Sequence, residues 1–101
     1  HGLFNSIRQA IYIQDAEGRF LDVNDGAVAM YGYARADFIG RRPDFLSAEG
    51  LNDLAALRAA HERAWAGETQ HFEFWGRRSS GEIFPKDVSL YKGSYFGQDV
   101  I

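Results

Sequence analysis

The sequence contains no cysteine and only two prolines in 101 residues. The absence of cysteine excludes disulfides, thiolate metal sites and cysteine nucleophiles. A long basic run is also missing, since 11 lysine and arginine residues stand against 14 acidic ones and the net charge is -3. Nucleic-acid binding rests on clustered positive charge, so we expect no nucleic-acid partner.

Long apolar runs are missing as well. No stretch approaches the roughly 20 residues that a membrane-spanning helix needs, and the pattern of a secretory signal is not present. We therefore expect no membrane contact by this domain and a cytoplasmic location, although a parent protein could be membrane-anchored.

Motifs for catalysis and metal binding are equally scarce. The three histidines, His1, His61 and His71, are scattered without the spacing of metal ligands. No nucleophile elbow, P-loop or GxGxxG pattern occurs. We predict neither a metal site nor catalytic residues, so the domain itself is not expected to be an enzyme.

Aromatic residues, by contrast, are plentiful and make up 15% of the chain. Such a content suits a thick core or an apolar cavity, and the sequence leaves both open. Strand-like segments at both ends with helical patterns between them favour an α+β domain with one antiparallel sheet. The predicted elements are strands at 10–14 and 19–23, short helices after Asn24 and at 35–39, a turn at 44–47, a helix at 51–66, strands at 69–78 and 83–92, a turn at 93–98, and a strand starting at 99.

Two periodic patterns indicate which side chains share a face. At helical spacing, the longest helix carries one stripe, formed by Leu54, Leu57, His61, Ala64 and Trp65. Beside this stripe, Arg58 and Glu62 have the spacing of an ion pair. In the strand 83–92, Lys86 alternates with Phe84, Val88 and Leu90 and so shares their predicted covered face.

Three local features resemble the PAS domain family. The end of the second predicted strand, Asp22-Val23-Asn24, resembles the family's D-x-N motif. Residues 31–40, YGYARADFIG, resemble its GYSREELIG segment, and residues 77–84, RRSSGEIF, resemble its RRKDG hairpin. Because these features occur in the family's order and at its spacings, the chain is identified as a member over essentially its whole length.

The resemblance implies a five-stranded antiparallel sheet, with short helices and one longer helix covering one face and a ligand-sized space between them. It also implies a sensory module that binds a small ligand or mediates dimerisation and passes the signal to an output domain in the same chain. A sensor histidine kinase is the expected parent. The alternatives are a diguanylate cyclase parent, or a ligand-free interaction and dimerisation module.

The sequence departs from the family at two places. Ala34 stands where the family caps the next helix with Ser or Thr, so we expect that helix to fray. The chain stops at Ile101, where the family's fifth strand continues. We interpret residues 1–101 as a single PAS domain excised from a larger multidomain protein and lacking the end of the last strand.

Two cofactors known from the family are weighed against the residues present. Residues 40–47, GRRPDFLS, resemble a segment of flavin-binding light sensors, but Pro43 replaces the reactive cysteine and Asp44 would repel a flavin phosphate. His61 lies at least a turn after the haem ligand of haem-binding members, which falls near Ala56, and Phe72 stands where they carry an Arg. We predict no haem and no cysteinyl-flavin; a non-covalent flavin or an unidentified small molecule stays open.

Lys86 is the most informative polar residue, because a lysine among apolar side chains costs free energy unless it is paired or reaches water. It could contact an acidic ligand group; alternatively, it pairs with a nearby carboxylate, or a bulge changes its phase. The candidate cavity residues are Tyr33, Phe45, Leu57, His61, Trp65, Phe72, Phe74, Lys86, Val88 and Leu90.

The opposite face of the sheet is a candidate partner surface. Alternation places His71, Glu73, Trp75 and Arg77 there, and an exposed Trp beside a Tyr suggests an interface. We expect a homodimer, with intramolecular cover by the first residues as the alternative. The candidate interface residues are Leu3, Phe4, Ile7, Tyr12 and Trp75.

Overall fold

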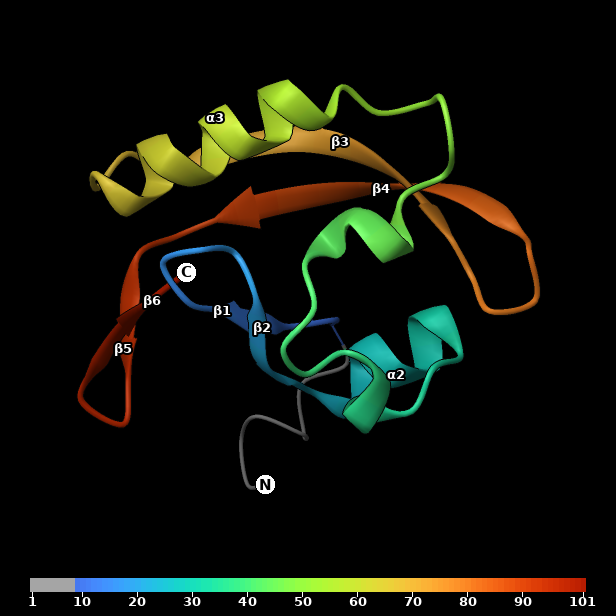
Figure 1. Cartoon of the computed structure of the whole chain (residues 1–101), viewed down its shortest axis with the longest axis horizontal. Helices are drawn as coiled ribbons and strands as arrows, with labels where there is room; N and C mark the ends of the chain where they lie inside the picture. Colours follow the sequence, from blue (N-terminus) through green and yellow to red (C-terminus); the bar gives the residue numbers. More distant parts are fainter. Residues whose placement is uncertain (1–8) are drawn as a thin grey trace.

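The computed structural model describes residues 9–101 (Figure 1). Three candidate interface residues, Leu3, Phe4 and Ile7, lie outside the described residues. Within the described range, strands occur at both ends of the chain and helices between them, which confirms the predicted α+β class.

The six described strands form three antiparallel pairs. β1 (Tyr12–Gln14) pairs with β2 (Phe20–Val23), and a bulge between Ile13 and Gln14 shifts their register. β3 (Gln70–Arg77) pairs with β4 (Ile83–Leu90) without a shift. β5 (Gly93–Tyr95) pairs with β6 (Gln98–Val100).

This arrangement differs from the predicted single sheet of five strands. The strand expected at 83–92 ends at Leu90, and the segment expected to turn forms β5 instead, because positive φ angles at Phe96 and Gly97 close a tight turn. Gln14 and Ile101 exchange two backbone hydrogen bonds of 2.8 and 2.9 Å, which join the first hairpin to the end of the last. Continuation of the strand beyond Ile101 stays a prediction.

The first helix follows its sequence signals closely. At the start of α2 (Asp25–Tyr31), the side-chain Oδ1 of Asn24 accepts a 3.0 Å hydrogen bond from the Ala27 amide, as an N-cap should. Gly32 ends α2 in the left-handed conformation with φ 79°. The next helix is only a 3₁₀ turn, η1 (Arg35–Asp37), and Ala34 provides it with no side-chain cap.

Backbone hydrogen bonds to β2 position the residues that follow η1. The backbone of Phe20 exchanges hydrogen bonds with Gly40 and Arg41. Pro43 then opens the 3₁₀ turn η2 (Pro43–Leu46), where its fixed φ and missing N–H are tolerated. As a result, η2 lies close to the β1–β2 hairpin.

The long helix is α3 (Leu54–Trp65), which lies along β3 in Figure 1. It begins at Leu54 and not at Leu51, because the Asp53 carboxylate caps it by accepting a 3.1 Å hydrogen bond from the Ala56 amide. Just before it, the Asn52 side chain accepts from the Trp75 amide at 2.9 Å and donates to the Trp75 carbonyl at 2.7 Å. Asn52 therefore ties the start of α3 to β3.

The core is built largely of aromatic rings. Phe38 is fully buried and lies edge-on to rings from several elements, with centroid distances between 5.7 and 6.4 Å. Edge-on pairs of this kind add stability beyond their buried area. The buried cluster consists of Phe20, Val23, Ala27, Tyr31, Phe38, Leu46 and Phe74.

Candidate functional site

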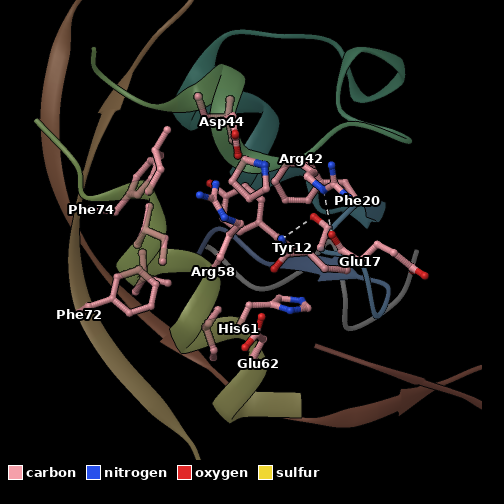
Figure 2. A pocket seen from close by; sticks show the side chains of 18 of the residues that line it. Tyr12, Glu17, Phe20, Arg42, Asp44, Arg58, His61, Glu62, Phe72 and Phe74 are labelled. Atoms are coloured by element: carbon pink, nitrogen blue, oxygen red, sulfur yellow. Dashed lines mark hydrogen bonds between the residues drawn. The ribbon is translucent and has the colours of Figure 1, made fainter. Parts of the chain in front are cut away.

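A cavity of about 430 Å³ lies between the β1–β2 hairpin, η2, α3 and the β3–β4 hairpin (Figure 2). Seven of the ten predicted cavity residues line it. They are Leu57 and His61 on α3, Phe72 and Phe74 on β3, and Lys86, Val88 and Leu90 on β4. The helix face predicted from the stripe and the strand face predicted from alternation therefore both contribute to the wall of one cavity.

The other three predicted residues do not line this cavity. Tyr33 and Phe45 pack against each other at 5.5 Å and against Phe38, as part of the aromatic core. Trp65 lies at the end of α3 beneath the ammonium of Lys92, which is 4.7 Å from the ring centroid. The aromatic character of these three residues correctly indicates that they pack against other side chains, but it does not distinguish a core position from a cavity wall.

Tyr12 is a cavity residue, and its prediction as part of the outer interface was wrong. Its ring lies 5.7 Å from that of Phe20 and 6.4 Å from that of Tyr31. The phase of a three-residue strand is hard to read from alternation, and the bulge after Ile13 brings Gln14 to the cavity as well. Trp75 is half-buried on the side of β3 opposite Phe74, and its role in an interface stays a prediction.

Lys86 is enclosed by aromatic side chains. Its Nζ donates a 3.1 Å hydrogen bond to the Tyr12 hydroxyl and lies 4.4, 4.5 and 5.3 Å from the ring centroids of Tyr12, Tyr31 and Phe74. No carboxylate forms a salt bridge with it among residues 9–101, so the predicted alternative of a paired lysine is not found.

Two opposing effects act on the Lys86 ammonium. The ring faces attract the charged form, by about 0.5–2 kcal/mol for each good contact. Removal from water favours the neutral amine, and this effect is the larger one: burial lowers the pKa of Lys86 from 10.5 to about 7. A neutral-pH solution therefore contains both protonation states of this side chain.

The pKa values of the two neighbouring tyrosines shift upward instead. Burial raises the pKa of both Tyr12 and Tyr31, so their hydroxyls stay protonated at neutral pH. The Tyr31 hydroxyl is buried, and no residue of the described part of the chain forms a hydrogen bond with it. It lies close to Gly76 of β3, and the Tyr31 ring packs near that of Phe84 of β4.

Comparison with known families and structures identifies the fold. A family model described as PAS domain matches residues 8–94. The chain belongs to the PAS domain family. A PAS domain is a sensory module of signalling proteins and is not itself catalytic.

Solved PAS structures align along nearly the whole chain. A domain of a sensory box sensor histidine kinase/response regulator from Geobacter sulfurreducens is 28% identical, with a TM-score of 0.79, and the alignment covers 97% of this chain and 82% of that one. The PAS domain of an HTR-like protein from Haloarcula marismortui is 23% identical, with a TM-score of 0.82 and coverage of 97% and 79%. A PAS domain from a two-component sensor histidine kinase is 22% identical, with a TM-score of 0.74 and coverage of 97% and 83%. A search of curated proteins gives no match.

His61 is the second unusual polar group in the cavity of this PAS domain. Its Nε2 is buried, has no hydrogen-bond partner among residues 9–101, and lies near Gly18 in the β1–β2 turn. Burial lowers the pKa of His61, although the backbone and carboxylate of Asp15 act in the opposite direction. Among the described residues, no group of three or more His, Asp or Glu side chains is arranged to hold a metal ion.

Five charged residues that were not among the predicted cavity residues also line the cavity, namely Glu17, Arg42, Asp44, Arg58 and Glu62. Figure 2 shows Arg58, His61 and Glu62 along the α3 wall, with Glu17 and Arg42 across from them. The Arg42 Nε donates a 2.9 Å hydrogen bond to the Glu17 carbonyl, which links the residue before η2 to the β1–β2 turn. The predicted Arg58–Glu62 ion pair is not formed. Helical spacing already placed Arg58 and Glu62 beside the stripe of His61, whereas the approach of Glu17 and Arg42 depends on contacts distant in sequence, which local patterns could not reveal.

The described helices are too short or too polar to span a bilayer.

Proposed function

We propose that this PAS domain senses a small molecule with an acidic group, held in the cavity at Lys86. The signal would pass to an output domain in the same chain, for which a histidine kinase is our first candidate. The observation that carries the proposal is a cavity of about 430 Å³ lined by Lys86, which is enclosed by aromatic rings and has no carboxylate partner within residues 9–101. The name of the 28% identical Geobacter sulfurreducens protein supports a kinase output.

The size and lining of the cavity support a small-molecule site. Ligand pockets usually have volumes of roughly 300–1,000 Å³ and combine apolar walls with a few polar groups. Here the walls are Leu, Val and Phe side chains, and Lys86 is the cationic group deepest among aromatic rings. A carboxylate at Lys86 would form a charge-assisted hydrogen bond, worth about 1.5–3 kcal/mol.

The alternative is a ligand-free interaction module whose own aromatic side chains fill the space. Phe72 and Phe74 do line the cavity, but Phe84 packs on Tyr31 at a centroid distance of 5.3 Å and Trp65 lies by Lys92. These side chains leave about 430 Å³ open, which favours the ligand-binding alternative.

Native mass spectrometry of the purified domain, followed by titration with benzoate as a probe acid, tests the proposal. We expect a retained small molecule or saturable benzoate binding in the wild type. Lys86→Met should keep the fold, checked by circular dichroism, and lose benzoate affinity at least tenfold, while Lys92→Met should bind as the wild type does. Equal affinity of Lys86→Met and wild type would remove Lys86 from the site.

A further inference from the structure

We propose that Lys86 is also a reactive amine, which forms an imine with a small aldehyde or ketone that enters the cavity. This inference rests on the cavity being a ligand site, as proposed above, and adds the chemical class of a covalent ligand. No catalytic turnover is implied, because the imine is a reversible modification of the sensor.

The placement of the amine is the first argument. Lys86 is among the residues that line a cavity of about 430 Å³, and it forms no salt bridge among the described residues. Its Nζ donates a 3.1 Å hydrogen bond to the hydroxyl of Tyr12, which lines the same cavity. A carbonyl compound in the cavity therefore has no bound carboxylate to displace from this amine.

The protonation state is the second argument. An ammonium has no lone pair and cannot attack a carbonyl, and an ordinary lysine is almost entirely ammonium at neutral pH. Burial lowers the pKa of Lys86 to about 7, so a large fraction of the amine is neutral there. Lysines desolvated in apolar pockets are the ones that proteins use for Schiff-base chemistry.

The other titratable and charged groups do not supply a competing partner. The groups that contact the amine directly are the Tyr12 hydroxyl from β1 and the ring of Tyr31 from α2. Burial is the cause of the pKa shift at Lys86. The remaining charged or titratable residues of the cavity wall are Glu17, Arg42, Asp44, Arg58, His61 and Glu62.

The reaction needs no other reactant. The lone pair of the neutral amine forms a bond to the carbonyl carbon, and the carbonyl oxygen takes up a proton. A second proton converts this hydroxyl to water, which leaves as the C=N bond forms and the nitrogen loses its remaining proton. Amine plus carbonyl thus gives imine plus water. The Tyr12 hydroxyl stays protonated, because burial raises its pKa, and is positioned to hydrogen-bond the nitrogen or the departing oxygen.

The chain provides its own control, since Lys86 and Lys92 are its two lysines. Lys92 is exposed at the end of the β3–β4 hairpin. The folded domain is incubated near neutral pH with benzaldehyde and sodium cyanoborohydride, which reduces an imine to a stable benzyl amine. Peptide mapping by mass spectrometry then compares benzylation of the two lysines.

We expect Lys86 to be benzylated at least tenfold faster than Lys92. The preference should disappear in concentrated urea, and the fraction of neutral Lys86 amine should stop rising well above about pH 7. Benzoate should protect Lys86 and leave Lys92 unaffected. Equal labelling of both lysines in the folded domain would overturn the proposal. If benzoate binds but Lys86 resists trapping, the covalent inference fails and the proposed function stands; if neither occurs, both fail.

Discussion

Gly76 shows how little space the aromatic core leaves. A Cβ atom at this position would lie 2.6 Å from the Tyr31 hydroxyl and 3.1 Å from the Phe84 ring. Both rings are confined by packed neighbours, so neither can move aside at low cost. A side chain at Gly76 would therefore displace Tyr31, whose ring faces Lys86.

We predict that Gly76→Ala lowers the free energy of unfolding by about 1–3 kcal/mol, the usual cost of overpacking. Gly93→Ala is the matched control, because Gly93 also lies in a strand but a Cβ there would meet nothing within 4 Å. The control should change stability by less than about 0.5 kcal/mol. Urea denaturation measures both, and equal losses would contradict the close packing at Gly76.

Lys86 makes the stability of the domain depend on pH. Its pKa is about 7 in the folded chain and 10.5 ordinarily, so between these values the unfolded chain binds more protons. Stability therefore rises with pH across this window. Below about pH 7 both states carry the proton, and the cost of burying the ammonium is present in full.

We predict that Lys86→Met raises the free energy of unfolding near pH 6 by about 2–4 kcal/mol, a magnitude set by the pKa shift. The gain should shrink steadily as the pH rises through this window and be nearly gone above about pH 11, where the lysine is largely neutral in both states. Urea denaturation at several pH values measures this, with Lys92→Met as control. A gain that does not change with pH would show that Lys86 stays charged in the folded chain.

At the scale of elements, Asn24 joins two of them. Its side-chain oxygen accepts hydrogen bonds from the amides of Ile11 at 2.8 Å and Ala27 at 3.0 Å, and its Nδ2 donates to the Gln9 carbonyl at 2.7 Å. The side chain is fully buried. It therefore caps α2 and also fixes the chain that enters β1.

We predict that Asn24→Ala lowers the free energy of unfolding by about 2–4 kcal/mol, because it removes a cap and leaves buried backbone groups unpaired. Asp53→Ala removes only the exposed cap of α3 and should cost about 1 kcal/mol. Chemical denaturation of both variants compares the two caps. Similar losses would show that Asn24 acts as an ordinary cap.

At the scale of the whole molecule, local signals account for much of the fold. The helix predicted after Asn24 is present, since N-capping acts over a few residues. The two strands of the β3–β4 hairpin were also predicted, because alternation is a local pattern.

The parts that could not be predicted depend on contacts distant in sequence. The side to which Tyr12 points is set by a bulge and by pairing with β2. Whether Tyr33 packs in the core or lines the cavity depends on its place beside Phe38. Lys86 was correctly placed on a covered face, but its ring cage assembles from β1, α2 and β3. The predicted homodimer stays a prediction, which sedimentation velocity can test.

The link between Asn52 and Trp75 joins the start of α3, one wall of the cavity, to β3. Near its other end α3 is joined to the same strand, since Arg63 Nε donates to the Gln70 side chain at 3.2 Å. The facing wall is the β1–β2 hairpin, which is bonded through Gln14 to Ile101. Under the proposed function, a ligand that moves this hairpin would therefore move Ile101 with it.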